Sequence, residues 1–128
     1  MKDPTSTLCV DVNVLINAHR PEQSRHEAVS AWLETARTGR EPLGVPSIAA
    51  SDFVRIVTHP RIFREPTPTR IAIEFINALV DSPATMLVEP GERHFTIFTG
   101  MCRDLELRGN TVPDAYLAAL ALEQGATL

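Results

Sequence analysis

The chain has 128 residues, of which 44% are hydrophobic and 22% charged, so we expect one globular domain over residues 1–128. Its longest uninterrupted apolar run, residues 115–122, is about half the length needed to cross a bilayer, and we expect no membrane segment. Sixteen acidic and twelve basic residues give a net charge of −4, which excludes a protein that coats nucleic acid through its overall charge.

The start of the chain and its cysteines indicate a cytoplasmic protein. No basic segment followed by an apolar stretch opens the sequence, so we expect no secretion signal. Cys9 and Cys102 are too far apart in sequence for a compact zinc motif. In the cytoplasm we expect both cysteines to be reduced thiols.

The first third of the chain predicts a strand, a helix and a second strand. Residues 7–10 (TLCV) are apolar and β-prone, which is typical of a buried strand. A helix should begin near Pro21 or Ser24 and end at Gly39. Its apolar residues recur every three or four positions and define the buried face: Val29, Trp32, Leu33 and Ala36. Residues 43–45 are the second predicted strand.

Two helices are expected in the middle of the chain. The first covers residues 47–57, with Ser47 as its N-cap. The second begins with Thr67 as its N-cap, and Pro68 suits its first turn. The second helix is apolar around most of its circumference as far as Pro83, so we expect other elements to cover it on both sides.

The last third predicts a strand at residues 85–88, two helices and the start of another strand. One helix covers residues 92–107 and should end at Gly109 in a left-handed cap. Its apolar face consists of Phe95, Phe98, Met101, Cys102 and Leu105. The other helix should begin at Asp114 and end at Gly125, and the three residues after it begin the strand.

This order of strands and helices predicts an α/β fold, a three-layer α/β/α sandwich around a mostly parallel sheet. The strands lack polar alternation, as expected when helices cover both faces of a sheet. In such sheets a ligand binds beyond the carboxyl ends of the strands, near the point where the strand order reverses. We therefore expect the functional site at that edge.

Two aspartates occupy positions of this kind. Asp11 directly follows the first predicted strand, and together with Asn13 it could hold and orient a divalent cation. Alternatively, Asp11 only caps a helical turn. Asp114 has the same two readings, as a metal ligand or as a helix cap. These residues on their own leave both readings open.

Three segments stand in a characteristic order and spacing along the chain. They are D-V-N-V-L-I at residues 11–16, F-V-R-I-V-T-H-P at 53–60 and V-P-D-A-Y-L-A-A-L-A-L-E-Q-G-A-T-L at 112–128. Together they resemble the PIN-domain ribonucleases of the VapC toxin family, and the last segment is the most specific part of the match.

The resemblance implies a PIN-like fold and the toxin of a type II toxin–antitoxin pair. The implied activity is Mg²⁺-dependent, with Mn²⁺ as an alternative, and it hydrolyses phosphodiester bonds of single-stranded RNA. Asp11 and Asp114 would ligate the metal, and Asn13 would share the catalytic site. Carboxylate oxygens suit hard divalent cations, which neutralise the scissile phosphate and lower the pKa of bound water. The implied protein partners are a cognate antitoxin and a second copy of the chain.

Two features depart from the family pattern. Ala50 stands where the family usually has a glutamate, and Asp52 is the only acid on that predicted helix. A shift of two helical positions turns a side chain by about 200°, so we expect Asp52 to pair with Arg55 and His59, with a metal-ligand role as the alternative. The family continues past Leu128 into a strand that ends in another acid, so we expect the last strand and tail to be missing here.

Four arginines between residues 53 and 73 are opposed only by Glu65. They are Arg55, Arg61, Arg64 and Arg70. Arginine makes planar, bidentate contacts with phosphate, so the first three are candidate RNA contacts, although a solvated helix face would also explain them. Tyr116, two residues after Asp114, is the aromatic residue expected to line the site. The aromatic residues expected in the core are Trp32, Phe75, Phe95 and Phe98.

Two other functions are compatible with the sequence. The chain could be a catalytically degenerate module of the same fold that binds an antitoxin or RNA without turnover. Alternatively, Asp11 could be the covalent nucleophile of a phosphotransferase. Such enzymes generally carry a second aspartate two residues later, where this chain has Asn13.

Overall fold

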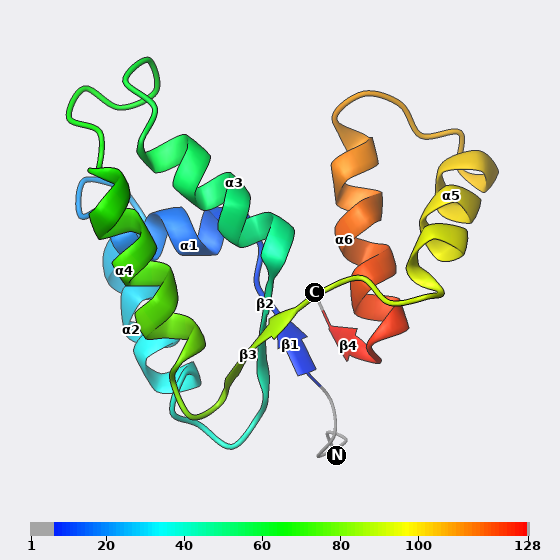
Figure 1. Ribbon diagram of the computed structural model, residues 1–128, viewed down its shortest axis with the longest axis horizontal. Coiled ribbons are helices and arrows are strands. Elements are labelled where there is room, and N and C mark those ends of the chain that lie inside the picture. The colour runs from blue at the N-terminus through cyan, green and yellow to red at the C-terminus, as the bar shows by residue number, and fades with distance from the viewer. Residues whose placement is uncertain (1–6, 128) are drawn as a thin grey trace.

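The computed structural model describes residues 7–127, which form a four-stranded sheet and six helices (Figure 1). The elements in chain order are β1 (Thr7–Cys9), α1 (Val12–His19), α2 (His26–Ala36), β2 (Leu43–Pro46), α3 (Ser47–Val57), α4 (Thr69–Val80), β3 (Thr85–Val88), α5 (His94–Asp104), α6 (Thr111–Glu123) and β4 (Ala126–Thr127). The predicted strand residue Leu128 lies outside the described residues. Within residues 7–127, no helix is both long enough and apolar enough to cross a membrane.

All four strands are parallel, and their order across the sheet is β3-β2-β1-β4. Leu8 lies opposite Leu43 on one side and opposite Thr127 on the other. The chain therefore moves outward from β1 to β2 and β3, and then returns to add β4 on the free side of β1. The strand order reverses at β1, which makes its carboxyl end the expected place for a ligand.

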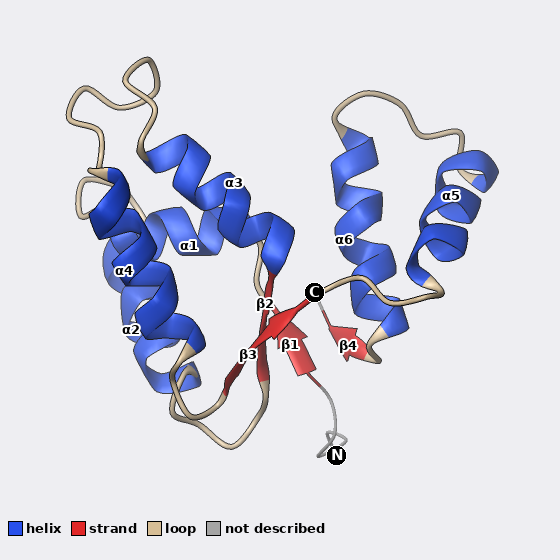
Figure 2. Ribbon diagram, viewed as in Figure 1, coloured by secondary structure: helices blue, strands red, loops and turns tan. Residues whose placement is uncertain are grey.

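The helices form two layers, one on each side of the sheet. Helices α1 to α4 lie on one side and α5 and α6 on the other, as Figure 2 shows with the strands between them. The predicted three-layer α/β/α sandwich with a parallel sheet is confirmed. In the second layer, α6 forms a buried cluster with the sheet, made of Cys9, Val88 and Leu120.

The larger core lies between the sheet and helices α1 to α4. Leu43 and Val45 of β2 are buried in it together with Phe53 of α3, whose side chain is 0% exposed. The Phe53 ring stacks on Phe75 of α4 at a centroid distance of 5.2 Å and meets the edge of His19 at 5.4 Å. Phe53 thus ties α1, α3 and α4 together behind β2.

Helix α1 is not among the elements predicted from the sequence, and two predicted helix caps are wrong. Residues 12–19 are helical because the Asp11 side chain accepts a hydrogen bond from the Val14 N–H and caps the first turn. Ser47 is the first residue of α3 and not its cap. Thr67 does not cap α4, which begins at Thr69, because the Thr67 side chain is buried and engaged with His19 and Arg20.

Some side chains that were expected in the core are exposed. Trp32 is 41% exposed, because its indole lines an open pocket beside β1. Phe95 is 71% exposed, because α5 packs mainly on α6 and presents this residue to solvent. Helix α4 is covered on one side only, with Ala72 buried and Ile73 exposed.

The boundaries of α5 and α6 also differ from the prediction. Helix α5 ends at Asp104, and the left-handed residue that follows it is Glu106, with φ of 49°, while Gly109 lies in the turn before α6. Helix α6 begins at Thr111, so Asp114 lies in its first turn and not at the cap. Pro113 is tolerated there because first-turn N–H groups have no partner within the helix. Gly125, with φ of 66°, follows the end of α6 as predicted.

Helices α5 and α6 are joined by two sets of hydrogen bonds. The carboxylate of Glu123, the last residue of α6, accepts from the N–H groups of Gly91 (2.7 Å) and Arg93 (2.8 Å). His94, at the start of α5, contacts the main-chain oxygen of Tyr116 through Nε2 at 2.9 Å. The Gly91 N–H is the main cause that lowers the pKa of Glu123 below its ordinary value.

Removing the Phe53 ring should destabilise the fold strongly. Phe53→Ala leaves a cavity among α1, α3 and α4, and we expect the free energy of unfolding to fall by about 3–5 kcal/mol. Phe95→Ala deletes the same atoms from an exposed site and should cost less than about 1 kcal/mol. Urea unfolding measures both changes, and equal losses would contradict the position of Phe53 in the core.

The α5–α6 connection should weaken in acid. Because folding lowers the pKa of Glu123, its carboxylate contributes stability above the ordinary value of about 4.5, and this contribution is lost as the pH falls below it. Glu123→Gln should lower the Tm at neutral pH and reduce the fall in Tm between neutral and acid pH. Glu92→Gln, an exposed neighbour, is the control, and identical pH profiles for both variants would contradict the prediction.

Candidate functional site

Asp11 stands at the carboxyl end of β1, where the strand order reverses. One of its oxygens, Oδ1, accepts from the Val14 N–H at 3.1 Å and caps α1. The side chain is half-buried, and Oδ2 has no hydrogen-bond partner in the described part of the chain. The cap thus occupies one carboxylate oxygen and orients the group, which leaves the second oxygen for a ligand.

Asp114 reaches the surface from the first turn of α6. It is exposed, and its carboxylate forms no hydrogen bond or ion pair with any other residue between positions 7 and 127. A carboxylate in the first turn is favoured by the positive end of the helix dipole. Asn13 is also exposed, and its main-chain oxygen accepts from the Asn17 side chain at 2.8 Å.

A small cavity of about 40 Å³ lies between the starts of α1, α3 and α6. Its walls are Val12, Ile48, Ala49, Asp52, Pro113, Tyr116 and Leu117. Val12 directly follows Asp11, and Pro113 directly precedes Asp114. The fold therefore brings the segments that carry the two aspartates, 103 positions apart in sequence, to the walls of one cavity.

Asp52 is the acid that α3 presents to this cavity. Its Oδ1 lies 3.5 Å from Nη2 of Arg55, so the predicted ion pair is present. His59 does not join the pair, since its Nδ1 accepts from the Arg61 N–H at 3.0 Å. Ala50, two positions before Asp52, packs into the core between the sheet and α1 to α4. The helical turn between them explains why one faces the core and the other the cavity.

The donor chemistry of the two aspartates fits a hard divalent cation. Mg²⁺ and Mn²⁺ take oxygen ligands, and Mg²⁺ keeps several waters when one or two carboxylates hold it. Asp11 and Asp114 are donors of this kind. No three histidine, cysteine, aspartate or glutamate side chains within residues 7–127 gather closely enough to form a larger ligand set.

Tyr116 is half-buried and its side chain forms part of the cavity wall. Its ring meets the edge of His94 at a centroid distance of 4.3 Å and that of Phe98 at 5.7 Å. His94, which is buried at the start of α5, was not predicted from the sequence as a site residue. The sequence signal that could have identified His94 is a histidine in the first turn of a helix with several apolar residues.

Two of the candidate RNA contacts lie away from the cavity. Arg61 and Arg64 are exposed in the loop between α3 and α4, at the end of α3 that is remote from the sheet (Figure 1). Asp52 lines the cavity, and α3 continues for about 7.5 Å along its axis from there to its last residue, Val57, before this loop begins. Arg55 is nearer, since it pairs with Asp52. Arg70 pairs with Glu74 at 3.0 Å. Arg61 and Arg64 form no ion pair among the residues that the structure describes.

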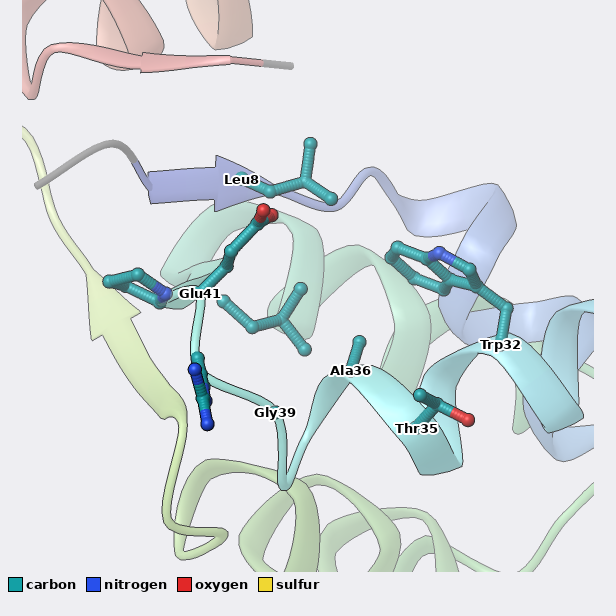
Figure 3. A pocket seen from close by; sticks show the side chains of 9 residues that line it. Leu8, Trp32, Thr35, Ala36, Gly39 and Glu41 are labelled. Atoms are coloured by element: carbon teal, nitrogen blue, oxygen red, sulfur yellow. The ribbon is translucent and has the colours of Figure 1, made fainter. Parts of the chain in front are cut away.

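A larger and mostly apolar pocket of about 410 Å³ lies near the amino end of β2. Figure 3 shows Leu8, Trp32 and Ala36 around it, with the carboxylate of Glu41 close to Leu8. A smaller pocket continues from it along β1 to Asp11. The walls of these two pockets are mostly apolar, and Asp11 lies at the end of the smaller one, whereas Asp52 lines the α3–α6 cavity.

Comparison with known proteins agrees with this fold. The PIN domain family matches residues 8–128. The chain is 44% identical to VapC ribonuclease Mb2897 of Mycobacterium bovis over 120 residues, which cover 94% of this chain and 82% of the relative. It is 34% identical to ribonuclease VapC25 of Mycobacterium tuberculosis, over 89% of this chain and 80% of that protein. The chain therefore belongs to the PIN-domain family and, within it, to the VapC ribonucleases.

Proposed function

We propose that this chain is the toxin of a type II toxin–antitoxin pair and hydrolyses phosphodiester bonds of single-stranded RNA with Mg²⁺ or Mn²⁺. One observation carries the proposal: Val12 and Pro113, the sequence neighbours of Asp11 and Asp114, line a single cavity at the edge where the strand order reverses. The ribonuclease names of the relatives support the same reaction class.

The chain's own residues have distinct roles in this proposal. Asp11 and Asp114 hold the cation, and the Val14 N–H keeps the Asp11 carboxylate oriented. Asn13 orients the ligand or the neighbouring carboxylate. A bound divalent cation neutralises the scissile phosphate and lowers the pKa of a water, so that no side-chain nucleophile is needed. Asp52 is a further acid at the same cavity, and Tyr116 supplies an aromatic wall.

The arginines would act at a distance from the cut. An RNA strand that follows α3 away from the cavity reaches Arg55 first and then the loop of Arg61 and Arg64. These side chains would hold phosphates several nucleotides from the scissile bond. This arrangement lets an acidic chain bind RNA, because the contact uses a local patch and not the net charge.

A binding module without turnover is the second candidate. It is favoured because no three histidine, cysteine, aspartate or glutamate side chains within residues 7–127 gather closely enough to hold a metal ion, and because Ala50 is buried where the family usually has an acid. With few protein ligands, the affinity for the cation would depend on water and on the RNA phosphate itself.

The proposal also includes two protein partners, a cognate antitoxin and a second copy of this chain, all in the cytoplasm. The exposed apolar side chains of the second helix layer support an interaction surface, since Phe95 and Leu105 of the α5 region are both largely exposed. Both cysteines are free thiols, which suits a reducing compartment.

Replacing either aspartate with asparagine should abolish cleavage. Asparagine caps a helix about as well as aspartate, so Asp11→Asn removes a metal ligand while α1 keeps its cap. We expect Asp11→Asn and Asp114→Asn each to lower the rate of RNA cleavage by about 100-fold or more. A fluorogenic single-stranded RNA assay with Mg²⁺ or Mn²⁺ measures the loss, and EDTA should reproduce it in the wild-type protein.

Asp81→Asn is the matched control, because Asp81 is an exposed aspartate at the end of α4, near the amino end of β3. It should cleave like the wild type. Cleavage that survives EDTA and both site substitutions would overturn the proposal. Wild-type protein that binds RNA but never cleaves it with either metal would establish the second candidate.

The loop arginines should contribute affinity that depends on salt. Arg61→Gln together with Arg64→Gln should weaken RNA binding, and removing each arginine–phosphate pair should reduce the slope of log K against log salt by about 0.7. Arg70→Gln is the control, since Arg70 already pairs with Glu74. Fluorescence anisotropy across a salt series measures the slope, and an unchanged slope in the double variant would show that RNA does not reach the loop.

A further inference from the structure

The first turn of α6 depends on α5 for its position. Asp114 lies in this turn with no side-chain partner of its own in the described structure, so its location is set by how α6 is held. Near this turn the buried residues Ala115 and Ala119 have small side chains, whereas Leu120, which packs with Cys9 and Val88, lies six residues after Asp114. A polar contact with defined direction near Tyr116 therefore adds orientation that the small side chains around Asp114 do not supply.

His94 supplies such a contact two residues after Asp114. Its Nε2 lies 2.9 Å from the main-chain oxygen of Tyr116, and because a carbonyl can only accept, Nε2–H is the donor. The His94 side chain is buried, and its ring stacks almost parallel to Phe98, with an interplanar angle of 7°. The same ring meets the edge of Tyr116, which lines the cavity.

A second contact holds the far end of the same helix. Tyr116 and Glu123 are seven positions apart and lie on one face of α6, about 10 Å from each other along the axis. Glu123 accepts from the N–H groups of Gly91 and Arg93, which directly precede His94. The segment from residue 91 to residue 94 therefore holds α6 at two points, and His94 provides the point nearer to the cavity.

We propose that His94 is a positioning residue for the nuclease site: its hydrogen bond to the Tyr116 carbonyl fixes the first turns of α6, and with them Asp114 and Tyr116, relative to Asp11. The inference rests on the proposed function, because Asp114 is taken there as a metal ligand. His94 itself touches neither RNA nor metal. It acts through the main chain of α6.

The test compares two substitutions that differ in one hydrogen bond. His94→Leu fills the space without a donor, whereas His94→Gln retains a donor near the position of Nε2. We expect His94→Leu to lower the affinity for Mn²⁺ by about tenfold, the loss typical of residues that orient a metal ligand, and to lower kcat more than it raises KM. His94→Gln should restore both. Electron paramagnetic resonance of free Mn²⁺ measures the affinity without any need for turnover.

Ser82→Ala is the control for a purely structural effect. Ser82 is buried near the amino end of β3; its hydroxyl accepts a hydrogen bond from Arg37 at 2.7 Å and donates to the Ala78 carbonyl at 2.9 Å, so its loss removes two bonds far from the cavity. It should lower the Tm but leave Mn²⁺ affinity unchanged. If His94→Leu behaves in the same way, or if His94→Gln fails to restore the affinity, the positioning role is wrong.

Two further variants keep the outcome decisive. If His94→Leu does not fold, His94→Asn takes its place, because its shorter amide does not reach the Tyr116 carbonyl. Asp114→Asn is measured in parallel. Unchanged Mn²⁺ affinity in Asp114→Asn would overturn the proposed metal site itself. Weakened affinity in Asp114→Asn together with wild-type affinity in His94→Leu would overturn only the role of His94.

Discussion

The reversal of strand order at β1 is the constraint on which the candidate site depends. Because β2 and β4 pair with opposite edges of β1, the helices that precede them lie on opposite faces of the sheet. The carboxyl end of β1 therefore opens between the starts of α3 and α6. Asp11 occupies that end, and α6 brings Asp114 to it from the other layer. The parallel sheet thus places the two aspartate-bearing segments at the same edge, although they are far apart in the sequence.

Asp11 is placed so that the two roles that the sequence presents as alternatives are compatible. As an N-cap it needs only one carboxylate oxygen, and the structure uses Oδ1 for this purpose. The second oxygen is available to a cation, so capping orients the ligand and does not compete with it. Asp52 and Ala50 lie two positions apart on α3 and point in different directions, so the Asp52 side chain lines the cavity and the Ala50 side chain packs in the core. The chain thus has an acid at this cavity, Asp52, although Ala50 stands where the family usually has a glutamate.

The charge of the chain has a similar local explanation. A net charge of −4 argues against nucleic acid as a partner only if charge is evenly spread. Asp11 and Asp114 adjoin residues that line the cavity, and a divalent cation bound between them would neutralise their charge. Arg61 and Arg64, which form no ion pair within residues 7–127, lie in one exposed loop. In the proposed complex the two kinds of charge act at opposite ends of α3.

The sequence by itself determined the α/β class, the three longer strands, most helix spans and the family, because apolar periodicity and the three motifs are local properties. It could not determine helix α1, the exposure of Trp32 and Phe95, or the burial of Thr67, since each depends on which neighbours the tertiary fold supplies. The same holds for the site. Asp11 and Asp114 could be selected from their motifs, but only packing, which joins residues far apart in the chain, brought the segments that carry them to one cavity. Packing also decided that Asp52 faces this cavity and that His94 contacts α6.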